Sequence, residues 1–190
     1  MLLSKKDIAY FKNNLESIGA YLVLELQKEL EQQGRKASGL LIDSIEYKVF
    51  QIVDRFEMHI TMLNHGLFAE KGVAADKVPY GRKTGKKISQ YIQGLINWIK
   101  IKQLTNGNEK AIKGFAFAIA KTHKKRTWNK YGNPSKGSFK YSKNGRRIGF
   151  LSHVLNTNEK KIEDDIFEGV GQSVDLMITD LFNKIAKQVR

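Results

Sequence analysis

The sequence of 190 residues contains no cysteine, and none of its apolar runs is long enough to cross a bilayer. The missing cysteine excludes a disulfide scaffold, a cysteine-ligated zinc site, an iron–sulfur cluster and thiol catalysis. The first seven residues, MLLSKKD, lack the apolar core of a signal peptide. We therefore expect a soluble protein that is made and used in a cytoplasm.

Acidic residues are nearly absent from the middle of the chain. Residues 77–147 contain 19 lysines and arginines but one acid, a net charge of +18, whereas the remaining residues carry a net −4. The densest part has no acid, and its ten basic residues are Lys121, Lys124, Lys125, Arg126, Lys130, Lys136, Lys140, Lys143, Arg146 and Arg147. Crowded like charges favour contact with a polyanion or an acidic surface. We predict that these residues face DNA or a partner protein; a solvated loop that only aids solubility is the alternative.

Catalytic and metal-binding motifs are missing as well. Residues 81–87, GRKTGKK, resemble a phosphate-binding P-loop but have three residues between the glycines instead of four, and Lys87 replaces the required hydroxyl. None of the four histidines has the spacing of a metal ligand pair. We predict a protein that is not an enzyme, with no catalytic residue, no cofactor and no metal.

A metal-dependent nuclease is the enzyme class that the acidic residues leave open. Such a site needs clustered acids near strand ends, often with a lysine nearby. The candidates are Asp43, Glu46, Asp54, Glu57 and the pair Glu70–Lys71. The same residues fit the solvated face of an amphipathic sheet, which is the interpretation that we prefer.

Hydrophobic periodicity predicts four helices. Apolar residues recur at steps of three and four from Ile8 to Leu30, and Gly34 follows as a helix-ending residue. The same periodicity predicts helices over residues 88–104, over residues 111–121 or beyond, and over residues of about 162–189. The small and aromatic residues of the third helix suit close packing against the second.

Period-two alternation predicts an antiparallel hairpin within residues 40–62, with a turn at residues 53–55 and one buried face. Residues 67–70 are expected to form a further short strand or a turn, which Gly72 ends. The fold class that follows is α+β. In this fold a small antiparallel sheet packs against N-terminal, central and C-terminal helices, in a single domain over residues 1–190.

A basic, aromatic insertion at about residues 122–152, here called the insert, separates the last two predicted helices. Its glycines and Pro134 argue against a continuous helix. It is expected to be a long loop ordered by a partner, or a hairpin arm with Asn144 and Gly145 at its tip. The aromatic residues that could anchor such an arm are Trp128, Tyr131, Phe139, Tyr141 and Phe150.

Several short motifs follow one another in an order that is typical of one family. The N-terminal helix precedes residues 37–47, ASGLLIDSIEY, and residues 67–72, LFAEKG; a helix with Trp98 and the alanine-rich residues 116–121, AFAIAK, come next. This order resembles the head–tail joining or tail-completion (neck) proteins of tailed bacteriophages, over residues 8–121 and again in the last helix. Here Phe68 stands where that family usually has tyrosine, and Glu70 follows Ala69 directly.

The resemblance implies a structural virion protein of the neck, assembled in the cytoplasm of a bacterial host. Its subunits would form a homo-oligomeric ring around the DNA channel, in contact with portal or adaptor proteins and tail proteins, and without a membrane partner. The insert would be an arm that grips a neighbour or touches packaged DNA non-specifically. The alternative is a stand-alone, non-specific nucleic-acid-binding protein whose insert aromatics stack on bases.

Overall fold

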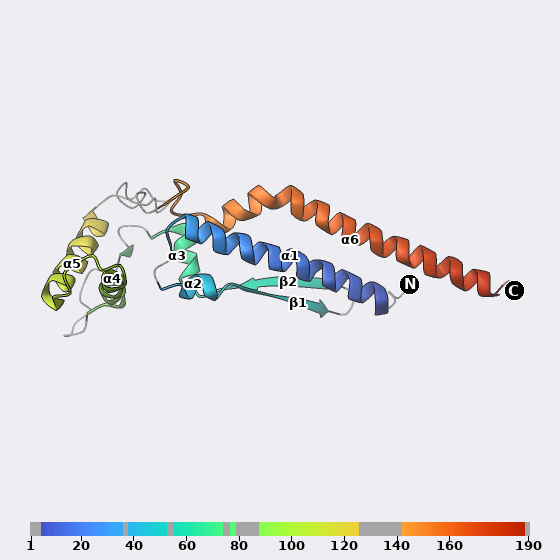
Figure 1. Ribbon diagram of the computed structural model, residues 1–190, viewed down its shortest axis with the longest axis horizontal. Helices are drawn as coiled ribbons and strands as arrows, with labels where there is room; N and C mark the ends of the chain where they lie inside the picture. The colour runs from blue at the N-terminus through green and yellow to red at the C-terminus, as the bar shows by residue number, and fades with distance from the viewer. Residues whose placement is uncertain are drawn as a thin grey trace. The chain divides into compact units, whose positions relative to one another are not determined.

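The computed structural model describes residues 5–35, 38–52, 55–73, 77–78, 88–125 and 142–188 (Figure 1). Along the chain the elements are α1 (Lys5–Gln32), α2 (Leu40–Asp43), β1 (Glu46–Ile52), β2 (Arg55–Thr61), α3 (Gly66–Lys71), α4 (Gln90–Ile101), α5 (Glu109–Lys125) and α6 (Phe150–Gln188). The structure confirms the α+β class, because the chain combines six helices with a small sheet of two antiparallel strands within the described residues.

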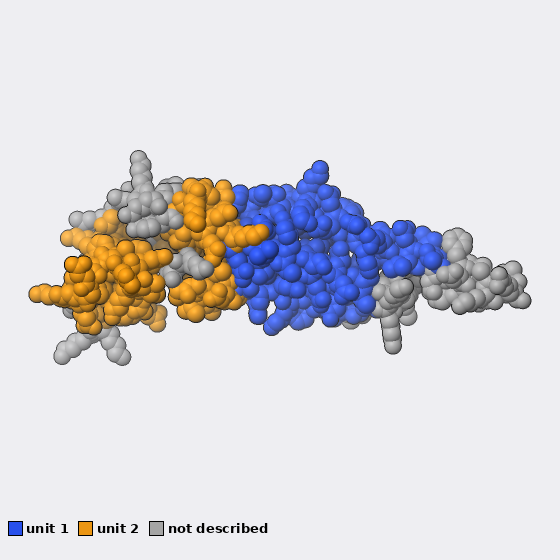
Figure 2. Space-filling model, viewed as in Figure 1, with its two compact units in different colours: residues 1–27, 45–62, 152–190 blue, residues 28–44, 63–151 orange. Residues whose placement is uncertain are grey.

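The chain groups into two compact units, which Figure 2 colours separately. Unit 1 comprises residues 1–27, 45–62 and 152–190, and unit 2 comprises residues 28–44 and 63–151. The helices α1 and α6 each contribute residues to both units. The single domain expected from the chain length stays a prediction.

In unit 1, α1 lies between the β-hairpin and α6 (Figure 1). On one side, Gly19 of α1 lies so close to Tyr47 of β1 and Met58 of β2 that a side chain there would collide with both. On the other side, Asn14 Nδ2 donates a hydrogen bond of 3.1 Å to the backbone oxygen of Asp165 in α6. The helix is therefore enclosed on two sides, which explains why Ile18, Leu22 and Leu26 are buried.

The structure confirms the antiparallel hairpin expected within residues 40–62, but Arg55, which was expected in the turn, is the first residue of β2. The strands β1 and β2 pair antiparallel from Glu46 opposite Thr61 to Ile52 opposite Arg55, and residues 53–54 between them lie outside the described residues. Alternate residues of β1, Tyr47 and Val49, are half-buried while their neighbours are exposed. One face of the hairpin is thus the inner face, as the alternation predicted.

Two short segments are helical although the sequence predicted otherwise. Residues 40–43 form the one-turn helix α2, and residues 66–71 form α3. Ser44 closes α2, since its backbone N–H and its hydroxyl both donate to carbonyl oxygens of that turn. In α3, Gly66 and Ala69 are buried three positions apart while Leu67 and Phe68 are exposed, which is helical spacing. The expectations of strand at residues 40–43 and of a short strand or a turn at residues 67–70 were wrong because short apolar runs carry no reliable period.

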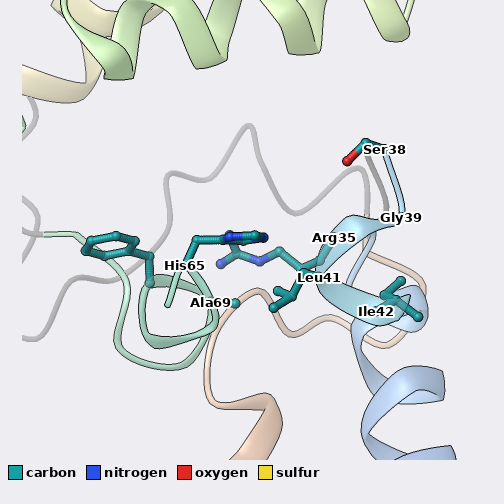
Figure 3. Close-up of a pocket in the computed structure, with 8 residues that line it drawn as sticks. Arg35, Ser38, Gly39, Leu41, Ile42, His65 and Ala69 are labelled. Carbon is teal, nitrogen blue, oxygen red and sulfur yellow. The ribbon is translucent and has the colours of Figure 1, made fainter. Parts of the chain in front are cut away.

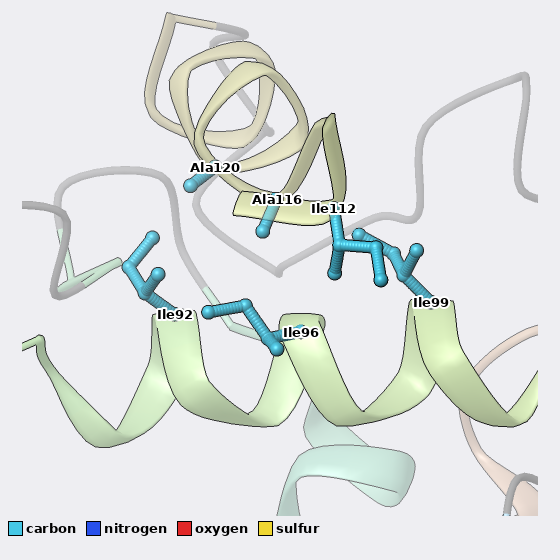
Figure 4. Close-up of a cluster of buried hydrophobic side chains, with 6 residues drawn as sticks. All are labelled: Ile92, Ile96, Ile99, Ile112, Ala116 and Ala120. Carbon is cyan, nitrogen blue, oxygen red and sulfur yellow. The ribbon is translucent and has the colours of Figure 1, made fainter. Parts of the chain in front are cut away.

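Unit 2 contains the packed helix pair α4 and α5. Three isoleucines of α4 face one isoleucine and two alanines of α5, all buried (Figure 4): Ile92, Ile96, Ile99, Ile112, Ala116 and Ala120. The small alanine side chains let the two helices approach closely, as expected from the sequence. Ser89 begins α4, where its hydroxyl accepts a hydrogen bond of 3.3 Å from Ile92 N–H.

The last helix begins at Phe150, well before the expected start near residue 162. Glu70 explains the earlier start, because its carboxylate accepts the backbone N–H of Leu151 at 2.8 Å and its carbonyl accepts that of Gly149 at 2.9 Å. These contacts satisfy free N–H groups next to the start of α6. The expected bounds of the insert are corrected accordingly: residues 122–125 belong to α5 and residues 150–152 to α6.

Replacing Gly19 tests the close approach of α1 to the hairpin. A Cβ at Gly19 would lie 2.4 Å from Tyr47 Cδ2 and 2.9 Å from Met58 Sδ, so Gly19→Ala should lower the free energy of unfolding by about 1–3 kcal/mol. The matched control is Gly94→Ala in α4, where no heavy atom lies within 4 Å, and which should raise it by about 0.5–1 kcal/mol. Urea unfolding followed by circular dichroism measures both; equal effects would contradict the packing described.

Candidate functional site

The basic residues predicted to face a partner divide into three groups. Lys121 and Lys124 are exposed on α5, and Lys125 is the last residue of that helix. Lys143, Arg146 and Arg147 lie in the described turn of residues 142–149. Four more lie outside the described residues: Arg126, Lys130, Lys136 and Lys140.

The predicted aromatic anchors are also divided. Phe150 is fully buried as the first residue of α6, so it packs inside unit 2 and does not belong to an exposed arm. The other four lie outside the described residues: Trp128, Tyr131, Phe139 and Tyr141.

A buried carboxylate on α1, that of Glu29, holds the turn of residues 142–149. Glu29 is only 5% exposed, and Arg146 donates to it twice, from Nε at 2.9 Å and from Nη2 at 3.2 Å. Asn144 Nδ2 donates to the same carboxylate at 2.9 Å, and Gln33 Nε2 donates at 2.9 Å. We call these four residues, Glu29, Gln33, Asn144 and Arg146, the Glu29 cluster.

The hydrogen bonds of the Glu29 cluster decide the charge state of Glu29. Burial acts to raise the pKa of this carboxyl, but hydrogen bonds from Arg146, Gln33 and Asn144, with the charge of Arg146, outweigh burial and lower the pKa below its ordinary value. The same hydrogen bond raises the pKa of Arg146. Both partners therefore stay charged near neutral pH, and Arg146 is occupied by the fold.

The end of α1 also gathers two arginines. Gly34 adopts a φ of 66°, and Arg35 N–H donates to Leu30 O at 2.9 Å, so α1 ends in a Schellman motif, with Gly34 in the role expected of it. The Arg35 guanidinium donates to the carbonyl oxygen of Arg147, and the Arg147 guanidinium donates to that of Gln33. Burial, together with the like charge of Arg147, lowers the pKa of Arg35 to about 10, so Arg35 remains a cation at neutral pH.

A pocket of about 280 Å³ opens beside Arg35 (Figure 3). Eight residues of unit 2 line it: Arg35, Ser38, Gly39, Leu41, Ile42, His65, Phe68 and Ala69. In Figure 3 the side chains of Arg35 and His65 extend toward each other over the apolar residues. The pocket therefore combines apolar walls with a cationic group, and it could accept an apolar group that carries a negative charge beside it. We call it the Arg35 pocket.

Sequence reasoning did not single out the Arg35 pocket. Arg35 lies far from the acid-free stretch in the sequence, and His65 showed no ligand spacing. The only signal was the pair of motifs quoted for the phage resemblance, because residues 38–42 and 68–69 fall within them. The motifs therefore mark the residues that build this pocket.

The acids considered for a nuclease do not gather into a site. Glu46 pairs with Lys48 at 3.7 Å, and Glu57 pairs with Arg55 at 2.9 Å on the exposed face of the hairpin. Glu70 serves the start of α6, while Asp54 and residues 81–87 lie outside the described residues. No group of three potential metal ligands occurs in the part of the chain that the structure describes.

Comparison with known proteins gives no match to a family model, to a curated protein or to a solved structure. Among the described helices, none is both long enough and apolar enough to span a membrane. A functional interpretation of this chain therefore depends on its own residues.

The Glu29 cluster predicts that Arg146 contributes to the stability of the fold and Lys143 does not. Both belong to the ten basic residues that the sequence predicted to face a partner. Arg146→Ala removes the cation from a buried carboxylate and leaves it with fewer hydrogen bonds, so it should lower the free energy of unfolding by about 1–3 kcal/mol. Lys143→Ala, the matched control, removes an exposed side chain and should change it by less than about 0.5 kcal/mol. Urea unfolding compares the two; equal costs would contradict the assignment of Arg146 to the fold.

The lowered pKa of Glu29 predicts a pH dependence. Because the pKa is lower in the folded protein, the stabilisation is complete above the ordinary pKa of 4.5 and disappears as the pH falls through the folded value. Glu29→Gln cannot form the ion pair, so the wild type should be more stable by about 1–3 kcal/mol at neutral pH. Urea unfolding should show this difference shrinking as the pH falls below 4.5, whereas a constant difference would contradict the lowered pKa.

Proposed function

We propose that this protein is a structural virion protein of a tailed bacteriophage, a ring-forming subunit of the head–tail connector around the DNA channel. The observation that carries the proposal is the order of the elements. An N-terminal helix, a hairpin, α3 with its FAEKG motif, α4 with Trp98, the alanine-rich α5 and a long C-terminal helix follow one another as in the neck proteins that the sequence resembles.

The FAEKG motif, residues 68–72, supports a structural role for the protein. Glu70 of this motif accepts N–H groups from the start of α6, so it fixes where the C-terminal helix begins. Phe68 and Ala69 line the Arg35 pocket. The motif thus contributes to the framework and to a surface cavity, as expected of a subunit that works by holding neighbours.

The positive charge on α4 and α5 suits a surface that lines a DNA channel. On α4 and α5, basic side chains such as Lys100, Lys110 and Lys121 are exposed. Lysine contacts to phosphate do not depend on base sequence, and they let DNA slide. A channel needs this kind of contact, because base-specific binding would oppose the passage of DNA.

Electron microscopy of the negatively stained, purified full chain tests the proposal. We expect closed rings of the chain itself, because subunits with different complementary surfaces close by rotation. The same experiment is made with a linker variant, in which a short glycine–serine linker replaces residues 128–140. This variant keeps the turn at residues 142–149, so the Glu29 cluster stays intact. Rings that persist in the linker variant would assign the insert to contact with DNA or with other virion proteins. Monomers of the full chain at all concentrations would contradict the proposal.

The alternative, a non-specific nucleic-acid-binding protein, is favoured by one observation: residues 121–147 contain ten basic residues and no acid. Such a protein would shift the mobility of DNA as a small species, and its affinity would fall steeply as the salt concentration rises. If the chain forms no ring but binds DNA in this way, the alternative replaces the connector.

A further inference from the structure

The long helix α6 has a buried face and an exposed face that carries apolar side chains. One face packs within unit 1, where Gly169 and Ser173 are buried. On the other, Phe167, Val170, Val174 and Ile178 follow at steps of three, four and four, which places them in one stripe. All four are exposed, and Phe167 is 73% exposed. We call these four residues the α6 stripe.

Acidic residues border the α6 stripe. Asp164, Glu168 and Asp175 are exposed and lie next to the stripe on one side, because each is three or four positions from a stripe residue or next to one in sequence. An exposed phenylalanine beside carboxylates on a helix is unfavourable in water when the protein is a monomer. Such a residue is typical of the anchor of a protein interface. The stripe therefore needs a partner with an apolar recess and a positive charge.

The Arg35 pocket of unit 2 has these properties. Its walls include Leu41, Ile42 and Phe68, and its volume of about 280 Å³ can hold an aromatic ring. Next to the lining residues, Leu40 is 62% exposed and Leu67 is 61% exposed, so the rim is apolar as well. The pocket and its rim form a second exposed apolar surface.

The charges of the two surfaces are complementary. Arg35 is a largely buried cation whose charged neighbour, Arg147, has the same sign. A carboxylate brought to the pocket would offset both the burial and the repulsion. The acids beside the α6 stripe supply such carboxylates, whereas α4 contains no acidic residue and α5 contains only Glu109.

We propose that the α6 stripe of one copy docks on the Arg35 pocket of the next copy, with Phe167 as the anchor and the acidic border facing Arg35. The two surfaces are different, so the contact is head-to-tail and passes from copy to copy until it closes a ring. This inference rests on the proposed function and names the contact through which the ring would form. A symmetric pairing of two α6 stripes is the competing arrangement.

Two charge-introducing variants test the contact in the full chain. Phe167→Asp damages the stripe and leaves the pocket intact, while Phe68→Asp damages the pocket and leaves the stripe intact. Each should weaken assembly at least about 30-fold, as expected of an interface anchor. The matched control is Ile101→Asp, at an exposed isoleucine of α4 outside both surfaces, and it should assemble like the wild type. Light scattering after size-exclusion chromatography measures assembly, and circular dichroism checks that each variant is folded.

Mixing the two variants separates head-to-tail from symmetric contact. The mixture holds one intact stripe, on the Phe68→Asp chain, and one intact pocket, on the Phe167→Asp chain. A head-to-tail contact therefore predicts a 1:1 heterodimer that neither variant forms alone. A symmetric contact between stripes predicts that Phe68→Asp still dimerises by itself, which would overturn the inference.

Cysteine cross-linking is an independent test of the contact. The chain has no cysteine of its own, so only the introduced cysteines can be linked. Oxidation of a chain that carries both Phe167→Cys and Phe68→Cys should produce a ladder of linked copies, whereas either single variant should stay unlinked. Rings that survive both Asp variants would overturn this inference and leave the connector proposal standing. A wild-type chain that is monomeric throughout would overturn both.

Discussion

The buried carboxylate of Glu29 is the constraint on which the described arrangement of unit 2 depends. A charge that is 5% exposed costs several kcal/mol unless it is paired, and here the compensation comes from Asn144 and Arg146, far along the chain. The pairing fixes residues 142–149 on the end of α1. Directly after this turn, Glu70 receives the N–H groups that begin α6. The carboxylates of Glu29 and Glu70 thus determine the position of residues 142–149 and of the start of α6.

These contacts explain how a strongly basic chain can form a defined fold. Arg146 is used by the fold, and Arg147 contacts the carbonyl oxygen of Gln33 at the end of α1, where cations are favourable. Lysines of α4 and α5 such as Lys100, Lys110 and Lys121 have exposed side chains, which is the kind of surface that suits a polyanion. The outward apolar stripe of α6 and the Arg35 pocket belong to a different kind of surface, one that suits protein contacts. A ring subunit around DNA needs both kinds.

Much of the fold was predictable because its signals are periodic. The steps from Ile8 to Leu30 gave α1, the isoleucines of α4 and the alanines of α5 gave the helix pair, and alternation gave the hairpin. The segments α2 and α3 were missed because runs such as LLI and LFA are too short to show a period. The start of α6 depends on Glu70, which is remote in sequence, so no local pattern could reveal it.

The candidate site was less predictable than the fold. Charge counting selected ten basic residues, but it could not distinguish Arg146, which meets Glu29 through tertiary structure, from exposed lysines such as Lys121. The Arg35 pocket was hidden for the same reason. Its residues come from the end of α1, from α2 and from the start of α3, and only folding brings them together.

Native mass spectrometry of the purified full chain measures whether copies of this chain form the proposed closed ring. We expect one dominant species whose mass is a fixed integer multiple of 21.7 kDa and does not grow with concentration. A spectrum that contains only the 21.7 kDa chain over the accessible concentration range would contradict it.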